Sequence, residues 1–207
     1  PKPDRVPMSA SAVRKAVIPI AGLGTRHFPA SHAVKKELFP VVGPDGIARA
    51  LFHYHLLELD AAGIEEICII VQPGEEERIR SYLRGPDADY LKRLEKHPAL
   101  LREAEQMRDF EQRVRFAVQH QQEGYGHAVF QTRAFADGQY VLLSLGDHLF
   151  RGRPESPYRE LAAMAGVAQG LSVSAVNRIR AGDLKGYGTI AGKRRPDNAR
   201  LIDVSLI

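Results

Sequence analysis

The sequence predicts an α/β fold in which helices flank a mostly parallel mixed sheet. Strand-like apolar runs alternate with helical segments, an order for which a parallel sheet is the natural solution. Residues 64–71 form a β-branched apolar run without polar alternation, which is typical of a central parallel strand covered on both faces. A glycine-rich turn at residues 21–26 directly follows the first apolar run, where an open α/β sheet would hold a ligand.

The predicted strands are apolar runs bounded by turn signals. They span about 15–20, 38–42, 64–71, 114–118, 140–145 and 171–178. The predicted helices begin or end at glycine, proline or charge signals. They span about 46–62, the segment from the glutamates 75–77 to Gly85, about 127–134 and about 157–167.

Residues 87–113 are strongly polar, with leucines at intervals and an interruption at His97-Pro98. They predict two amphipathic helices inserted into the core fold. Residues 1–14 contain three prolines and predict a flexible lead-in. The folded domain is therefore expected to span 15–207.

The 207 residues are 44% hydrophobic and 26% charged, the composition of an ordinary globular protein. The sequence has no apolar run of about 18 residues, and its start lacks the apolar centre of a signal peptide. The single Cys68 lies in an apolar run and is predicted to be a small buried hydrophobe. These features predict a cytoplasmic protein with no membrane span and no disulfide.

The formal net charge is +4, from 29 basic and 25 acidic residues that form no long block. This balance favours anionic ligands. No aromatic residues interleave with a basic stripe, and no nucleic-acid motif is present, so phosphorylated small molecules are favoured over nucleic acid.

The turn after the first predicted strand has the composition of a phosphate-binding loop. Gly22 and Gly24 are expected to adopt dihedrals closed to other residues and to bring backbone N–H groups close to an anion. Arg26 and Lys36 add positive charge. The loop lacks the Gly-Lys-Ser/Thr ending of a Walker motif and the third glycine of a dinucleotide fingerprint. It therefore predicts a nucleotide site of another kind.

Gln119 lies at the end of a predicted strand, and Gly124 and Gly126 come just before a predicted helix. A side-chain amide offers a donor and an acceptor side by side, so Gln119 is a candidate for reading the polar edge of a base. The alternative is a plain tight turn, with Gln119 ending its strand in water.

Asp147 follows the apolar run 141–145. A lone carboxylate after a strand suits Mg²⁺ held together with substrate phosphates, and its alternative role is to cap a turn or the next helix. The histidines form no H-E-x-x-H pattern, and one cysteine makes no framework, so a zinc site is not predicted. The sequence also lacks the G-x-S-x-G elbow of covalent hydrolases.

Together these motifs resemble the sugar-nucleotidyltransferase family, and most closely its bacterial UTP:glucose-1-phosphate uridylyltransferases. The similar segments occur in the family's order: 16–26, Pro29-Ala30, Lys36-Glu37, Gln119 with 124–128, Gly146-Asp147 and Tyr187-Gly188. The insertion at 87–113 is similar to one in the uridylyl branch. The resemblance covers 15–207 and implies a Rossmann-like fold of the nucleotide-diphospho-sugar transferase type.

The resemblance implies that a sugar 1-phosphate oxygen attacks the α-phosphorus of UTP, with Mg²⁺, and that pyrophosphate leaves. Glucose 1-phosphate is the implied acceptor and UDP-glucose the product. Arg26 and Lys36 would be the catalytic cations, Gln119 would read the uracil edge, Asp147 would bind Mg²⁺, and Gly188 would meet the sugar. The other implied nucleotide contacts are Ala21, Gly22, Leu23, Gly24, Thr25, Glu37, Gly124, Gly126 and His127.

Two departures from the family pattern affect these expectations. His32 and Lys35 stand where close relatives usually carry Lys and Pro, so a phosphate contact is expected either to be weaker at His32 or to come from Lys35. The family continues beyond the position of Ile207 into a Glu-Lys-Pro segment and a second metal aspartate. The chain is therefore expected to hold the nucleotide half of such an enzyme and to be C-terminally incomplete.

Alternatives stay open at this point. One is a catalytically silent nucleotide-binding or regulatory relative. Another is a thymidylyl or other sugar-1-phosphate nucleotidyltransferase, because an amide that reads a pyrimidine edge separates uracil from thymine only through space for the methyl group. The oligomeric state is also open, and exposed core at the chain end would favour a homo-oligomer.

Overall fold

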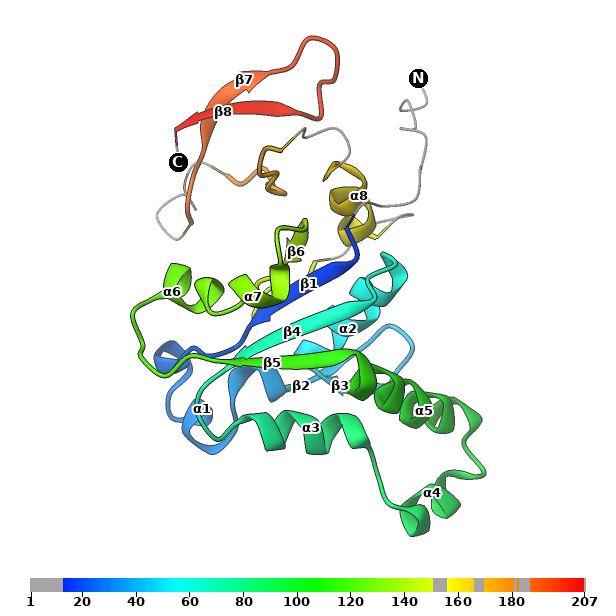
Figure 1. Cartoon of the computed structure of the whole chain (residues 1–207). Coiled ribbons are helices and arrows are strands. Elements are labelled where there is room, and N and C mark those ends of the chain that lie inside the picture. The colour runs from blue at the N-terminus through cyan, green and yellow to red at the C-terminus, as the bar shows by residue number, and fades with distance from the viewer. Residues whose placement is uncertain (1–12, 151–155, 166–169, 181, 183–186, 207) are drawn as a thin grey trace. The chain divides into compact units, whose positions relative to one another are not determined.

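The computed structural model describes residues 13–150, 156–165, 170–180, 182 and 187–206 (Figure 1). The chain divides into two compact units between Val173 and Ser174. The first unit contains a four-stranded sheet in the order β5-β4-β1-β6, and every pairing in it is parallel. Most of the predicted lead-in at 1–14 lies outside the described residues.

The elements of the first unit confirm the predicted α/β alternation. The strands of the main sheet are β1 (Lys15–Pro19), β4 (Glu66–Val71), β5 (Val114–Val118) and β6 (Val141–Leu143). The helices are α1 (Ala30–Ala33), α2 (Leu51–Ala61), α3 (Glu76–Arg84), α4 (Ala88–Leu94), α5 (Pro98–Arg113), α6 (Tyr125–Phe130), α7 (Arg133–Ala136) and α8 (Pro157–Ala163). The helices α4 and α5 confirm the two helices predicted within 87–113.

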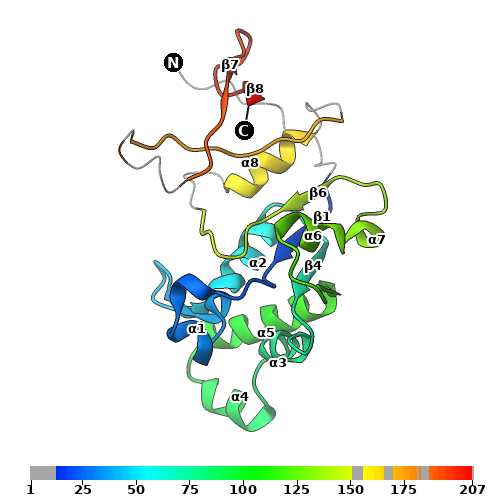
Figure 2. The same ribbon diagram turned by 90° about the vertical axis from the view of Figure 1, so that its left-hand side faces the viewer.

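Helices cover both faces of the sheet (Figures 1 and 2). On one face, Ile18 and Ile69 pack in a core with α2, α3, α5 and α8. On the other face, Val17 and Cys68 pack with residues of α6 and α7. Successive strand residues point to opposite faces, so a strand covered on both sides needs apolar residues throughout. This explains the unalternated run of β4 and confirms that Cys68 is buried.

The sequence predicted that a helix begins at residue 46, but the segment 46–50 is not helical. Residues Pro40–Val42 (β2) and Ala48–Ala50 (β3) form a two-stranded antiparallel sheet, and the helix begins only at Leu51. Gly46 has a φ of 79° in the turn between these strands, so it serves a hairpin turn rather than a helix start. The strand predicted at 38–42 is therefore confirmed near its end but lies outside the main sheet.

The strand predicted at 171–178 is absent from the described residues, which run there without regular structure and are largely exposed. The second unit instead contains β7 (Ala191–Arg194) and β8 (Ile202–Leu206), an antiparallel pair that the sequence analysis did not predict. At Gly192 a Cβ would lie 2.3 Å from the Asp203 carbonyl oxygen, so only glycine fits this close approach of the two strands.

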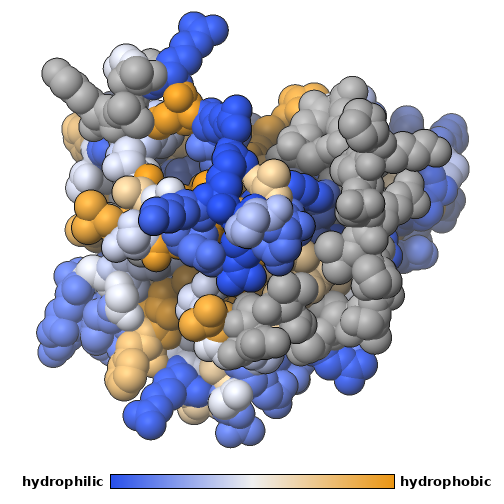
Figure 3. Space-filling model, turned by 90° about the horizontal axis from the view of Figure 1, so that it is seen from above, coloured by the Kyte–Doolittle hydropathy of each residue, from blue (hydrophilic) through white to orange (hydrophobic). Residues whose placement is uncertain are grey.

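In the described part of the chain, no helix has both the length and the apolar character needed to cross a membrane. Hydrophobic and hydrophilic residues are interspersed on the described surface visible from above (Figure 3).

Candidate functional site

The predicted site residues of the first unit lie at one edge of the sheet. Because its four strands are parallel, their carboxyl ends share that edge. The chain leaves β1 into the loop 20–26, leaves β5 at Gln119, and leaves β6 toward Asp147. The strands β4 and β5 lie on one side of β1, and β6 lies on the other, so the strand order reverses beside β1. Ligands of open α/β sheets bind at such a reversal.

The loop after β1 turns sharply at Gly24, whose φ of 67° is in the left-handed region. A Cβ there would lie 3.1 Å from the Ser31 Cβ, and the Ser31 hydroxyl donates to the Gly24 carbonyl at 2.8 Å. The left-handed backbone thus favours glycine at 24, and a Cβ there would also need Ser31 to shift slightly. Gly22 is not in the left-handed region, so the conformational reason predicted for it is wrong. Leu23, Thr25 and Arg26 are exposed or partly so on this loop.

Ala21 at the start of this loop is held in place from β4. The N–H of Ile20 donates to the Ile70 carbonyl at 2.8 Å, which continues the pairing of β1 with β4 past the strand end. The Gln72 side-chain amide donates to the Ala21 carbonyl at 2.7 Å. Gln72 was not among the predicted site residues, although its place directly after the 64–71 run could have identified it.

Lys36 and Asp147 lie together beside the loop. The Lys36 Nζ is 2.7 Å from the Asp147 Oδ2. Burial alone would raise the pKa of Asp147, but the hydrogen bond and charge of Lys36 outweigh it, so this pKa lies below its ordinary value. A cavity of about 430 Å³ opens here. Its lining residues are Arg26, His27, Lys36, Phe39, Leu51, Asp147 and His148.

Glu37, next to Lys36, is buried, with 2% of its surface exposed. Its Oε1 lies 3.7 Å from the Lys36 Nζ, and its Oε2 has no hydrogen-bond partner among the described residues. Burial raises the pKa of Glu37 to about 7, against the lowering effect of its own backbone N–H and of Lys36 and Lys35. Around neutral pH the Glu37 carboxyl is therefore partly protonated.

Lys35 is buried and its ammonium forms an ion pair with the Glu75 carboxylate. This pair joins the segment after α1 to the start of α3, so the ammonium already has an anionic partner. His32 is exposed on α1. The phosphate contact expected from Lys35 would thus require it to leave Glu75.

Gln119 is buried, with 3% of its surface exposed, which contradicts the alternative that it ends β5 in water. Its Nε2 donates to the Gly124 carbonyl at 3.1 Å and lies 3.2 Å from the His127 Nδ1. Gly124 has a φ of 98° and marks the turn into α6, whereas Gly126 lies inside α6 and needs no special dihedrals. Gln119 thus fixes the segment that the sequence assigned to the base.

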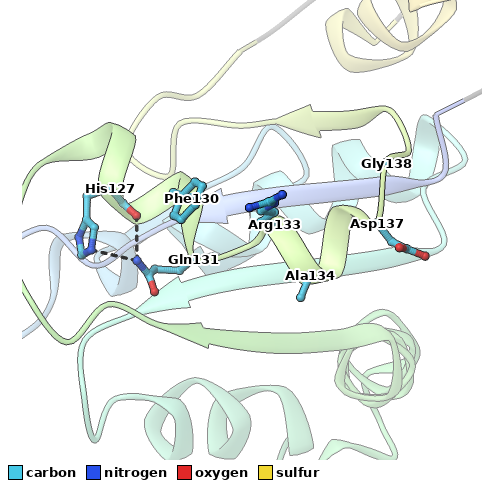
Figure 4. Close-up of a pocket in the computed structure, with 7 residues that line it drawn as sticks. All are labelled: His127, Phe130, Gln131, Arg133, Ala134, Asp137 and Gly138. Carbon is cyan, nitrogen blue, oxygen red and sulfur yellow. Dashed lines mark hydrogen bonds between the residues drawn. The ribbon is translucent and has the colours of Figure 1, made fainter.

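A second hollow runs along α6 and α7 (Figure 4). Its lining residues are His127, Phe130, Gln131, Arg133, Ala134, Asp137 and Gly138. The Gln131 amide donates to the His127 carbonyl at 3.2 Å (Figure 4). Of these residues only His127 belongs to the predicted site, so this hollow is separate from the cavity beside Lys36 and Asp147.

Asp147 fits a magnesium ion that also binds phosphates. Its carboxylate is half-buried at the cavity and offers hard oxygen ligands. Within the described residues no group of three or more His, Cys, Asp or Glu side chains could hold a metal by itself. Mg²⁺ bound with a nucleotide usually takes only one or two carboxylates, so a single aspartate is compatible with it.

Gly188 lies in the second unit and is exposed. Its predicted contact with the sugar stays a prediction.

The sequence matches the family described as nucleotidyl transferase over residues 15–202. A UTP–glucose-1-phosphate uridylyltransferase of Mycoplasma pneumoniae is 34% identical over 145 residues, which are 68% of this chain and 46% of that protein. One of Bacillus subtilis is 32% identical over 179 residues, which are 86% of this chain and 57% of that protein. The chain thus spans about half the length of these curated relatives.

Two solved structures share the fold. A UTP-bound UGPase from Acinetobacter baumannii superposes with a TM-score of 0.72 at 26% identity, over 93% of this chain and 66% of that one. A UDP-glucose pyrophosphorylase complexed with UDP-glucose superposes with a TM-score of 0.70 at 22% identity, over 87% of this chain and 63% of that one. At that lower identity the second likeness concerns the fold alone.

Proposed function

Because the chain belongs to the nucleotidyl transferase family, we propose that it binds UTP and takes part in transferring a uridylyl group to glucose 1-phosphate. The observation that carries this proposal is the Lys36–Asp147 pair at 2.7 Å, beside the Gly24 turn where the strand order reverses. A cation for phosphates and a carboxylate for a metal ion meet there. The relatives' names supply the choice of UTP and of the sugar.

In the proposed complex, Arg26 and Lys36 contact the triphosphate and spread its negative charge, while the Gly24 turn presents backbone N–H groups to it. Asp147 would hold Mg²⁺ together with the phosphates. The ion, when bound, neutralises charge on the phosphates and on the leaving pyrophosphate. In-line attack by the sugar phosphate requires positioning and charge neutralisation from the protein and no covalent intermediate.

We assign the base to the segment around Gln119. The Ala21 region and Gly124 lie at the ends of β1 and β5, with the Gln72 amide at the end of β4 between them. The Gln119 Nε2 is engaged with Gly124 and His127, so the amide oxygen, held in a buried position, is the group that would accept from the N–H of a pyrimidine edge. Selectivity for UTP over dTTP then depends on whether the site leaves space beside the base for the methyl group of thymine.

We further propose that the protein works in the cytoplasm. Its one cysteine is buried and unpaired, which suits a reducing compartment.

The decisive experiment is calorimetric titration of UTP into this chain, with and without Mg²⁺, and with dTTP and ATP as competitors. Selective UTP binding that tightens with Mg²⁺ would support the proposal. A folded chain that binds none of the three nucleotides would overturn it. Formation of UDP-glucose and pyrophosphate from UTP and glucose 1-phosphate would separate an enzyme from a protein that only binds the nucleotide.

A further inference from the structure

We propose that His55, Ser144 and Tyr158 are positioning residues that fix the turn carrying Asp147, and so aim its carboxylate at the metal and phosphates. None of the three was singled out in the sequence. The positioning role itself is inferred from the geometry beneath Asp147. Its effect on metal and phosphate binding rests on the proposed function.

The three side chains form a buried hydrogen-bonded cluster. The His55 Nδ1 lies 2.7 Å from the Tyr158 hydroxyl and 2.9 Å from the Ser144 hydroxyl, and these hydroxyls are 2.7 Å apart. All three residues are at most 5% exposed. His55 lies on α2, Ser144 directly follows β6, and Tyr158 lies on α8, so the cluster joins three parts of the fold at one point.

The cluster acts on Asp147 through the backbone of its neighbour. The His55 Nε2 lies 3.2 Å from the Gly146 carbonyl. Burial lowers the pKa of His55 to about 4, so the ring is neutral at neutral pH and carries one proton. A carbonyl only accepts, so that proton is on Nε2, and Nδ1 accepts from a hydroxyl. Every polar group of the cluster can then be satisfied.

Gly146 is held from its other side by β1. A Cβ at this position would lie 2.6 Å from the Ile20 Cγ2 and 2.8 Å from the Pro19 carbonyl oxygen. The N–H of His148 donates to the Leu145 carbonyl at 3.1 Å and closes a tight turn around Gly146 and Asp147. The backbone is thus clamped between β1 and the His55 ring, directly before the carboxylate that pairs with Lys36.

The same helix supplies a matched control. His53 is also buried, with 1% of its surface exposed, and its Nδ1 lies 2.9 Å from the Tyr82 hydroxyl. Burial lowers the pKa of His53 to about 4, as it does for His55. Its ring packs against Tyr82 and Phe110, on α3 and α5. His53 is thus a buried histidine with a tyrosine partner, two positions from His55, and its hydrogen bond and ring contacts are with α3 and α5 rather than with Gly146.

The test compares His55→Asn, His55→Gln and His53→Asn in the full chain. Asparagine keeps a polar group near the Nδ1 position and loses the donor to Gly146, whereas glutamine places an amide N–H near the Nε2 position. Mn²⁺ binding to each protein with saturating UTP is followed by electron paramagnetic resonance. Hydrogen exchange of amides 145–148 is measured without any ligand.

We expect His55→Asn to weaken Mn²⁺ binding about tenfold, the lower end of the loss typical when an outer partner of a metal ligand is removed. It should also speed exchange at 145–148, while His55→Gln restores both and His53→Asn changes neither. Wild-type Mn²⁺ affinity in His55→Asn, or an equal loss in His53→Asn, would overturn the inference. If His55→Asn fails to fold, Tyr158→Phe replaces it, with smaller changes expected in the same direction.

Failure of the proposed function gives a different result. In that case the wild-type chain itself would bind no UTP or Mn²⁺. The exchange measurement would still decide the positioning role, because unchanged exchange at 145–148 in His55→Asn contradicts it with or without ligand.

Discussion

The Lys36 ammonium and the Asp147 carboxylate form an ion pair, 2.7 Å from Nζ to Oδ2, between residues 111 positions apart in the sequence. The pair joins the segment after β1 to the end of β6, across the place where the strand order reverses. Each group neutralises the other in this structure, and in the proposed complex the triphosphate and Mg²⁺ would provide each with a new partner. Without Mg²⁺, substitution of Lys36 and substitution of Asp147 should therefore change UTP affinity in opposite directions.

Replacing Lys36 by methionine should lower UTP affinity by about tenfold or more, because a charge-assisted hydrogen bond to phosphate is worth about 1.5–3 kcal/mol. The free energy of unfolding should change little, since the side chain of Asp147 is 31% exposed and water can solvate it. Calorimetry and urea unfolding measure the two quantities. Lys92→Met, in an exposed pair with Asp89, is the control and should leave UTP binding unchanged.

Replacing Asp147 by asparagine should abolish the gain in UTP affinity that Mg²⁺ provides. Without Mg²⁺ the variant should bind UTP at least as tightly as the wild type, because it removes a negative charge beside the triphosphate. Titrations of UTP into the variant and the wild type, once with Mg²⁺ and once with EDTA, measure the UTP affinity with and without the metal ion. A variant that keeps the full Mg²⁺ effect would show that another group holds the ion.

Replacing Gln119 by alanine should weaken UTP binding by about tenfold, because loss of a buried hydrogen-bonding group costs about 1–3 kcal/mol. It should also free the turn at Gly124, whose carbonyl accepts from the Gln119 amide. Gln131→Ala is a matched control, since its amide contacts His127 from the C-terminal end of α6. If both variants lose UTP affinity equally, Gln119 acts through the order of this segment rather than by contact with the base.

The sequence could predict what depends on short-range patterns. The unalternated run of β4 predicted a central strand. Polar residues that follow strands predicted that Gln119 and Asp147 lie at one edge of the sheet, because parallel strands bring their ends to one edge. The helices α4 and α5 followed from the leucine spacing and from His97-Pro98.

Other features depend on contacts between distant segments, which no local pattern records. Residues that were predicted to begin a helix instead form part of the β2–β3 hairpin. Gln72 and His55 look like an ordinary loop residue and an ordinary helix residue until Ala21 and Gly146 lie beside them. Lys35 was one of two alternatives for a phosphate contact, and in the structure its partner is Glu75, which is 40 positions away.

Cys68 should be unreactive in the folded chain. It is 2% exposed, and burial raises the pKa of its thiol to about 12, so the reactive thiolate is scarce at pH 8. Labelling with a thiol reagent should be slow in buffer and fast in urea, with the rate following unfolding. Rapid labelling in buffer would show that the core between β4 and α6 opens readily.

Glu37 makes stability depend on pH in a direction opposite to that of a salt-bridged carboxylate. Burial raises its pKa from 4.5 to about 7, so between these values the folded chain keeps a proton that the unfolded chain has lost. The wild-type free energy of unfolding should therefore fall as pH rises through this window, and stay low above it. Glu37→Gln cannot ionise, so it should match the wild type near pH 5 and exceed it by about 2–3 kcal/mol at pH 8.

Urea unfolding of both proteins at pH 5 and pH 8 measures this difference. Glu65→Gln serves as the control, because Glu65 is 55% exposed in its pair with Arg14 and should show no such rise. The contact of Glu37 with Lys36, at 3.7 Å, works against the effect of burial. If Glu37→Gln is instead less stable than the wild type at pH 8, that contact outweighs burial and Glu37 is ionised in the fold. Its carboxylate would then add negative charge next to Asp147, and Mg²⁺ rather than Lys36 alone would be needed to offset it when a triphosphate binds.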